Sequence, residues 1–194
     1  RERDITTITR NLIIANVVIF ILSTFTYAGY RLYPYLALWP LPHTQLWQPV
    51  TYAFLHGGMF HLAFNMFGLW MFGRVVEQQL GFARFAQYYA ACVFGAALIH
   101  LIMSPIVGHG NFMVGASGGV LGVVLAFGVM FPEVKLVVFP IPVPIKAKWV
   151  ISGFVVVSLA LGVTDAAPSI AHFAHLGGML FGWRLLDHWR NQIR

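Results

Sequence analysis

The sequence predicts an all-α integral membrane protein, a bundle of six transmembrane helices with both termini in the cytoplasm. Hydrophobic residues make up 59% of the 194 residues and charged residues only 9%, and the mean hydropathy is +0.76. A typical soluble domain has about 45–50% apolar and about 25% charged residues. The composition therefore excludes a disordered chain and an ordinary soluble domain, and the single cysteine, Cys92, excludes a disulfide framework. The net charge is +6, but the 12 Lys and Arg residues are scattered and form no basic stripe, which disfavours a nucleic-acid partner.

Long stretches without Asp, Glu, Lys or Arg define the helices, because one span needs about 20 apolar residues. Residues 85–132 form an uncharged run that is too long for one helix and fits two, joined by a turn near residues 104–111. Over residues 31–58, four prolines and several Trp and Tyr residues predict a non-helical loop in the headgroup region. The predicted spans of this single membrane domain, residues 1–194, are residues 11–30, 59–76, 85–103, 114–131, 149–164 and 169–186.

The basic residues predict the orientation of these spans. Of the 12 Lys and Arg residues, all except Arg31 fall on one face of the six-span arrangement. Cytoplasmic loops carry an excess of Lys and Arg, so this face and both termini are expected in the cytoplasm. The connection that contains Pro140, Pro142, Pro144, Lys146 and Lys148 is expected to be a stiff segment on the cytoplasmic membrane surface.

Four polar residues are then expected at one depth, near the outer face. His61 and Asn65 lie in the first turns of the second span, Ser117 in the first turn of the fourth, and His175 in the second turn of the sixth. At about 1.5 Å per residue, all four lie roughly 5–10 Å below the outer surface. Polar groups inside a membrane are costly and usually mark a functional site.

Ser117 is the candidate nucleophile. It stands between Gly115 and Gly118–Gly119 at the start of a helix, where exposed backbone N–H groups can hold a developing oxyanion. The alternative is a helix contact made of small residues, since Gly118 and Gly122 are four residues apart. The soluble-hydrolase elbow with a similar pattern requires a preceding strand, which is implausible here.

His175 is the candidate general base, because a serine needs a base to become a nucleophile. His172, one turn earlier, is its rival and is expected nearer the loop. Gly178 and Gly182 permit close approach of another helix, and the glycine-rich segment after Ser117 is a suitable partner. The alternative for either histidine is a hydrogen-bonded residue in a helix contact.

His61 and Asn65 share one helix face and can both donate hydrogen bonds to an oxyanion, or they form a polar clamp between helices. His56 is expected to hold the end of the preceding loop. Glu77, with Arg74, is expected to cap the end of the second span as a structural residue.

Several polar residues are expected to be less informative. Asp165 could orient a histidine, although a solvated loop end is the simpler interpretation, and His100 and His109 are expected at the interface. Zinc bound by His56, His61, His172 and His175 is disfavoured, because the sequence has no His-Glu-x-x-His motif and no nearby acid. We therefore expect no metal site.

These residues together resemble the rhomboid intramembrane serine proteases, over about residues 47–182. The resemblance rests on four motifs in order, none specific alone: His56-Gly-Gly-Met-Phe-His61-Leu-Ala-Phe-Asn65-Met66; Glu77-Gln-Gln-Leu-Gly81 with Arg84-Phe85 and Tyr88; Gly115-Ala116-Ser117-Gly118; and Ala174-His175-Leu-Gly-Gly178.

The resemblance implies a rhomboid-like six-helix bundle that cleaves transmembrane segments of membrane proteins through a serine–histidine dyad and an acyl-enzyme. Ser117 would be the nucleophile and His175 the base, and the backbone N–H of Ser117 would stabilise the oxyanion together with His61 and Asn65. Gly115 would fit the turn before the serine. The implied partners are transmembrane substrates and the lipid bilayer, and no cofactor is implied.

Two positions depart from the family pattern. Gln48 follows Trp47 where an arginine is common, and Leu121 replaces an aromatic residue that packs on the base. Three other functions stay open: an inactive rhomboid-like protein that binds and escorts membrane proteins, a small transporter, or a purely structural bundle. The expected location is a bacterial plasma membrane, with the active site opening to the outer face.

Overall fold

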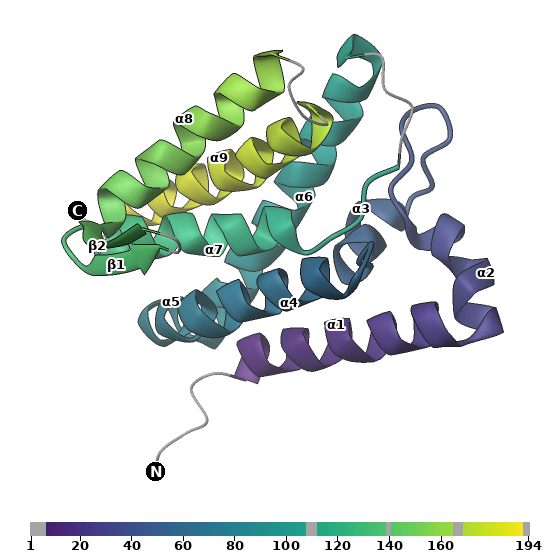
Figure 1. Cartoon of the computed structure of the whole chain (residues 1–194), viewed down its shortest axis with the longest axis horizontal. Helices are drawn as coiled ribbons and strands as arrows, with labels where there is room; N and C mark the ends of the chain where they lie inside the picture. Colours follow the sequence, from purple (N-terminus) through teal and green to yellow (C-terminus); the bar gives the residue numbers. More distant parts are fainter. Residues whose placement is uncertain (1–6, 108–111, 139–140, 165–168, 192–194) are drawn as a thin grey trace.

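The computed structural model describes residues 7–107, 112–138, 141–164 and 169–191. Each predicted span overlaps a helical segment (Figure 1), but the first span, residues 11–30, is interrupted, because one helix ends at Phe25 and the next begins at Tyr27. The first of these helices is α1 (Thr7–Phe25). The second predicted span corresponds to a continuous segment made of α4 (Met59–Gly68), the π-helical η2 (Leu69–Gly73) and α5 (Arg74–Leu80). The remaining helices are α6 (Phe82–Val107), α7 (Ser117–Met130), α8 (Ala147–Thr164) and α9 (Ser169–Asn191).

The described residues include three helical segments long and apolar enough to cross a membrane: Thr7–Phe25, Met59–Leu80 and Phe82–Ile106. Ser117–Met130 and Ala147–Val157 are apolar but shorter. The six-span count, the side of the termini and the single domain over residues 1–194 stay predictions.

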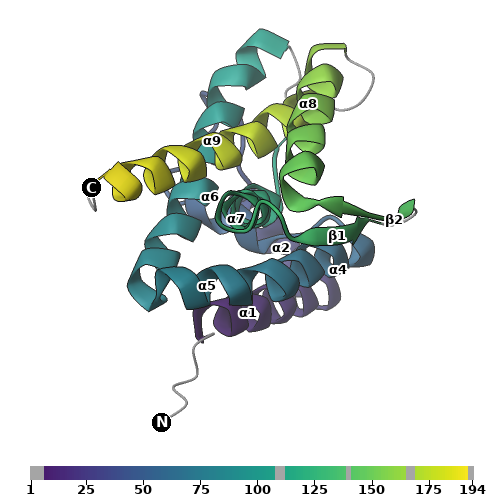
Figure 2. The ribbon, with the colours of Figure 1, turned by 90° about the vertical axis from the view of Figure 1, so that its left-hand side faces the viewer.

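The shorter helix α7 lies in the middle of the bundle. Figure 2 shows it end-on, with α4–α5, α6, α8 and α9 around it. The helix packs against α6, α8, α9 and η2, and α9 also packs extensively along α6. An apolar helix surrounded in this way can be shorter than its neighbours, because the segments around it reach beyond its ends.

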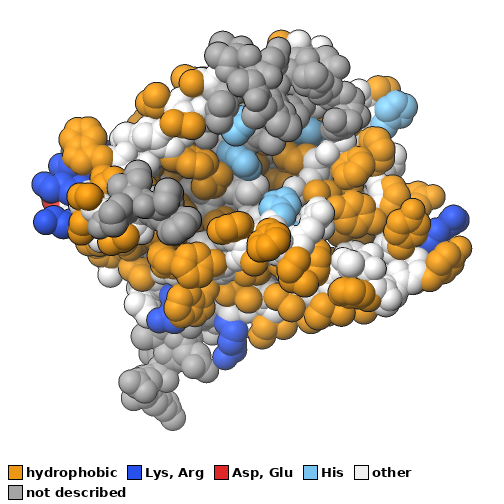
Figure 3. Space-filling model, viewed as in Figure 1, with side chains coloured by type: hydrophobic (Ala, Val, Ile, Leu, Met, Phe, Trp, Pro, Cys, Tyr) orange, Lys and Arg blue, Asp and Glu red, His pale blue; other side chains and the backbone are white. Residues whose placement is uncertain are grey.

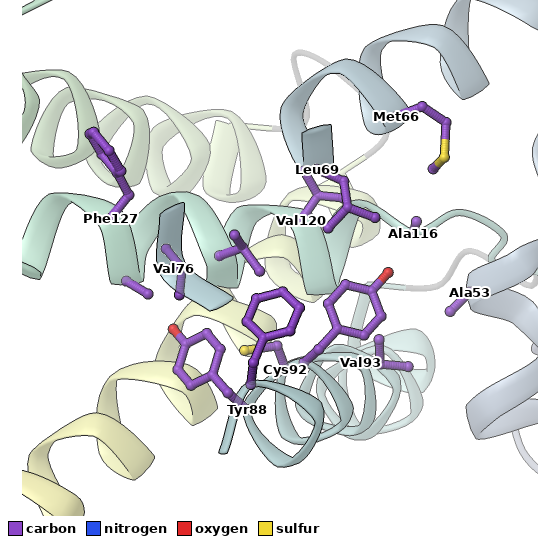
Figure 4. Packing of buried hydrophobic residues seen from close by; sticks show 14 of the residues in the cluster. Ala53, Met66, Leu69, Val76, Tyr88, Cys92, Val93, Ala116, Val120 and Phe127 are labelled. Atoms are coloured by element: carbon purple, nitrogen blue, oxygen red, sulfur yellow. The ribbon is translucent and has the colours of Figure 1, made fainter. Parts of the chain in front are cut away.

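Glycines allow the close packing around α7. A Cβ added to Gly122 would lie 2.3 Å from Sγ of Cys92, and one added to Gly178 would lie 2.3 Å from the carbonyl oxygen of Gly118. The helix backbones therefore approach more closely than any side chain permits, as the glycine spacing in α9 predicts. The buried residues beneath this contact include Tyr88, whose hydroxyl donates to the Gly122 carbonyl at 2.7 Å (Figure 4).

The prediction of a non-helical segment over residues 31–58 is wrong in part. α1 ends at Phe25, and α2 (Tyr27–Leu36) follows, capped by the Thr26 hydroxyl, which accepts from the Gly29 N–H at 3.0 Å. Pro34 lies late in this helix and removes only one backbone donor there. α3 (Gln48–Thr51) and the 3-10 helix η1 (Tyr52–Phe54) follow, with Pro49 near the start of α3, where its missing N–H has no helical partner to lose.

The proline-rich connection before α8 is a β-hairpin, whereas the sequence predicts only a stiff segment there. β1 (Lys135–Val138) pairs antiparallel with β2 (Ile141–Lys146), with Lys135 opposite Lys146. The carboxylate of Glu133 pairs with Lys146 at 2.6 Å and also with Lys148. Prolines are tolerated in β2 because each strand of a two-stranded sheet has one unpaired edge.

Candidate active site

Ser117 and His175 meet across the contact between α7 and α9. The Oγ of Ser117 lies 2.7 Å from Nε2 of His175, although the two residues are 58 positions apart. Ser117 is the first residue of α7, and His175 lies in the second turn of α9. The contact of Gly118 with Gly178 holds the two backbones at the distance that this hydrogen bond needs.

Gly115 shapes the turn before the serine. Its φ of +127° lies in a region that L side chains rarely adopt, and its N–H donates to the Tyr52 carbonyl at 3.0 Å. A Cβ at this position would lie 2.8 Å from Cε1 and Nε2 of His61 and 3.7 Å from Oγ of Ser117. The absence of a side chain at Gly115 therefore lets the His61 ring lie directly over the turn that precedes Ser117.

The protonation of His61 follows from its neighbours. Its Nδ1 accepts from the Gly57 N–H at 3.4 Å, so the neutral ring carries its proton on Nε2, the atom beside Gly115. Nε2–H is thus a donor on the side of Ser117. Asn65 is buried, and its Nδ2 donates to the His61 carbonyl at 2.8 Å, which leaves a second N–H on the same nitrogen.

The remaining histidines have different positions. His172 contacts His175 edge to face, with the ring centroids 6.3 Å apart, and it is His175 that bonds to Ser117. His56 is buried and contacts His61, with centroids 5.1 Å apart. His100 is buried within the bundle, so its side chain does not face lipid headgroups; its depth in the membrane stays a prediction. Asp165 and His109 lie outside the described residues.

Glu77 has a different partner from the one expected. Its carboxylate accepts from the N–H groups of Ile8 and Thr9, both at 2.9 Å, and from the Thr9 hydroxyl at 2.7 Å. Arg74 instead lies 5.2 Å from the ring centroid of Trp70. No local pattern predicts this pairing, because Thr9 in the first turn of α1 lies 68 positions from Glu77. A carboxylate binds there because the first N–H groups of a helix are free.

The two departures from the family pattern have local explanations. Gln48 is buried and anchors the segment before α3: its Nε2 donates to the Tyr35 carbonyl at 3.1 Å, and its Oε1 accepts from Trp39 N–H at 3.3 Å and Gln45 N–H at 3.1 Å. Leu121 is half-buried, and the ring that contacts His175 belongs to His172.

Tyr52 is a site-supporting residue that the sequence reading missed. Its carbonyl accepts from Gly115 and its hydroxyl donates to the Val93 carbonyl at 2.7 Å, so it connects the turn before Ser117 to α6. Within the described parts of the chain, no three His, Cys, Asp or Glu side chains converge as a metal site.

These features define a serine–histidine pair inside a helical membrane bundle. The sequence model of the rhomboid domain family matches residues 43–187, and the chain belongs to the rhomboid family. It is therefore a multi-pass integral membrane protein.

Three relatives illustrate the similarity. The chain is 33% identical over 139 residues to RHOMBOID-like protein 6, mitochondrial, of Arabidopsis thaliana, covering 72% of this chain and 42% of the relative. It is 35% identical over 140 residues to Rhomboid protein 1, mitochondrial, of Saccharomyces cerevisiae, covering 68% and 39%. It is 28% identical over 144 residues to Presenilin-associated rhomboid-like protein A, mitochondrial, of Danio rerio, covering 74% and 37%. The chain thus spans about two fifths of the length of these relatives. Their names do not support the predicted bacterial plasma membrane.

Proposed function

We propose that this chain is an intramembrane serine endopeptidase that cleaves transmembrane segments of other membrane proteins. The observation that carries the proposal is the 2.7 Å contact between Ser117 Oγ and His175 Nε2. A nucleophile within hydrogen-bond reach of its base is the geometry that covalent catalysis requires. Membership of the rhomboid family supports the same conclusion.

In the proposed reaction, Oγ of Ser117 attacks a peptide carbonyl carbon while Nε2 of His175 takes the hydroxyl proton. The carbonyl oxygen becomes an oxyanion. Collapse of the tetrahedral intermediate breaks the C–N bond, and His175 gives the proton to the leaving amine. Water then attacks the acyl-enzyme by the same route and releases the carboxylate product.

The oxyanion would be held by donors that are already oriented. The backbone N–H of Ser117 lies at the start of α7, where the helix leaves its first N–H groups free. The Nε2–H of His61 lies beside Gly115, and the second N–H of Asn65 lies one helical turn below His61. Removing one donor of this kind typically costs about 2.7–4 kcal/mol of barrier.

The same proposal includes the membrane topology. Residues 1–194 form one domain that crosses the bilayer six times, and the ends of α1 and α9 that carry the termini face the cytoplasm. In Figure 3, basic side chains lie near the hairpin and the start of α1, and a further one lies over α2 at the other end; much of the visible face is hydrophobic. Ser117 lies at the opposite end of α7, so the site would open to the other side. A helical substrate must unwind there, because helix hydrogen bonds occupy its carbonyls.

Cleavage of a model transmembrane substrate in proteoliposomes tests the proposal. The parent chain should produce two fragments, and Ser117→Ala and His175→Ala should produce none. A substrate with Gly or Pro near the cut site should be cleaved faster. Equal cleavage by Ser117→Ala would contradict the proposal, and an uncleaved substrate with a folded parent would favour an inactive, escorting relative.

A further inference from the structure

A cavity lies where α1, α2 and the segment before α4 meet. Its lining reaches His56 and Gly57, which contact His61, but includes neither Ser117 nor His175. Its volume is about 660 Å³. The polar residues that line it come from all three segments: Ser23, Thr24, Tyr30, Arg31, Tyr33, Tyr35 and His56. A cavity of this size accommodates a small polar group, and no step of the proposed cleavage reaction uses it.

The lining of this cavity has the chemistry of an anion site. It presents a guanidinium and several hydroxyl groups, and no Asp or Glu occurs anywhere between residues 5 and 76. Arg31 is the only Lys or Arg between residues 11 and 73. Its side chain is exposed and has no ion pair among the described residues. A guanidinium supplies several N–H donors in a planar fork that matches the oxygens of a phosphate.

His56 provides an independent observation at the same place. It is only 3% exposed, its ring lies near the Phe54 backbone, and neither ring nitrogen has a well-formed hydrogen bond within the described residues. Buried polar atoms are normally satisfied, and His56, unlike the equally unpartnered His100, lines this cavity, where a ligand can reach it. The neutral ring needs one acceptor for its N–H and one donor for its other nitrogen. A phosphate oxygen and a nearby hydroxyl would supply both.

The surroundings of the cavity indicate a lipid. Phe25, Tyr27, Tyr30 and Tyr35 are all exposed around the junction of α1 and α2, as expected at the level of lipid headgroups. Along α1, an exposed apolar stripe of Ile14, Val18, Ile21 and Phe25 leads toward this junction. Acyl chains can lie on such a stripe while the headgroup enters the cavity.

We propose that this cavity binds the phosphodiester headgroup of an anionic phospholipid, with Arg31 as the main phosphate contact and His56 as a second one. A glycerol headgroup fits best, because its hydroxyls can donate to the nitrogen of His56 that lacks a proton. The bound lipid would connect the end of α1, helix α2 and the segment around His56 that precedes α4.

Native mass spectrometry of the full chain in dodecyl maltoside tests this site, with phosphatidylglycerol, phosphatidylcholine and inorganic phosphate as probes. One phosphatidylglycerol should remain bound per parent chain, and Arg31→Gln should weaken this binding about tenfold, since it removes charge-assisted hydrogen bonds. Arg31→Lys should lose less. Arg190→Gln, which removes the same charge at the other end of the bundle, should bind like the parent.

Ser117→Ala should also bind like the parent, so this test is independent of the proposed protease activity. Equal retention by Arg31→Gln and the parent, at equal thermal stability, would overturn the site. Inorganic phosphate binding as tightly as the lipid would overturn the assignment to a lipid, and so would equal retention of phosphatidylcholine.

Discussion

The backbones of α7 and α9 touch at Gly118 and Gly178, next to the residues that form the candidate dyad. A Cβ on Gly178 would lie 2.3 Å from the carbonyl oxygen of Gly118 and 3.1 Å from its Cα. Ser117 precedes Gly118 by one residue, and His175 precedes Gly178 by three. The separation of the helices at this point therefore determines whether Ser117 and His175 can bond.

Gly178→Ala should separate the two helices and weaken the dyad. The added methyl meets backbone atoms that cannot rotate away, and overpacking of this kind costs about 1–3 kcal/mol. We expect a lower unfolding midpoint and a larger loss in the labelling rate of Ser117 by a fluorophosphonate. Gly153→Ala on α8 is the matched control, because nothing lies within 4 Å of its added Cβ. Parent-like labelling of Gly178→Ala would show that the close contact is not needed.

Gly115→Ala should impair the site with less effect on the rest of the fold. The φ of +127° would be strained for alanine, by about 1–3 kcal/mol, and the methyl would meet the His61 ring at 2.8 Å. We expect slower cleavage at nearly unchanged helix content measured by circular dichroism. Gly58→Ala provides the control, since its Cβ has open space and its φ of 170° suits any residue. Unchanged cleavage by Gly115→Ala would argue against a role for the His61 position.

Glu77→Gln should detach the start of α1 without touching the dyad. The substitution keeps the shape of the side chain but removes the charge that accepts from Ile8, Thr9 and the Thr9 hydroxyl. A hydrogen bond to a charged group contributes about 1.5–3 kcal/mol to stability, so the unfolding midpoint should fall clearly. Amide exchange should accelerate in the first turn of α1. The exposed Glu133→Gln serves as comparison and should leave α1 exchange unchanged.

The hairpin should respond to acid at a lower pH than an ordinary glutamate would. Hydrogen bonds from Lys146 and Lys148 lower the pKa of Glu133 from 4.5 to about 2. A depressed pKa stabilises the folded hairpin above the ordinary value, and this contribution is lost as pH falls from about 4.5 toward 2. Carbon-13 NMR of the Glu133 carboxyl should show a midpoint near 2, and Lys146→Gln should raise it. A midpoint at the ordinary value in the parent would contradict the paired geometry.

The helices could be predicted from the sequence because a helix that crosses the bilayer needs a long stretch without charged residues. The pairing of Ser117 with His175 was predictable for a related reason: glycines flank both residues, and two glycine-rich helices that begin on one side pack closely. The reactive residues and the glycines that predict close helix packing therefore occur in the same short segments.

Other features depended on contacts that no local pattern reports. α2 forms although Pro34 lies within it, because the cap from Thr26 and the late position of the proline outweigh the loss of one donor. The hairpin of β1 and β2 needs Glu133 to pair with Lys146, and Glu77 needs a helix start 68 residues earlier. The partner of Gln48 is likewise a carbonyl 13 residues away in α2.

Covalent labelling with a fluorophosphonate, followed by mapping of the modified peptide, tests the central claim most directly. The parent in detergent should be modified on Ser117, and His175→Ala should lose the modification because the serine has lost its base. His172→Ala should retain it, since His172 contacts His175 but does not bond to Ser117. Labelling that persists in Ser117→Ala, or that disappears in His172→Ala while His175→Ala keeps it, would contradict the assignment of Ser117 and His175 as nucleophile and base.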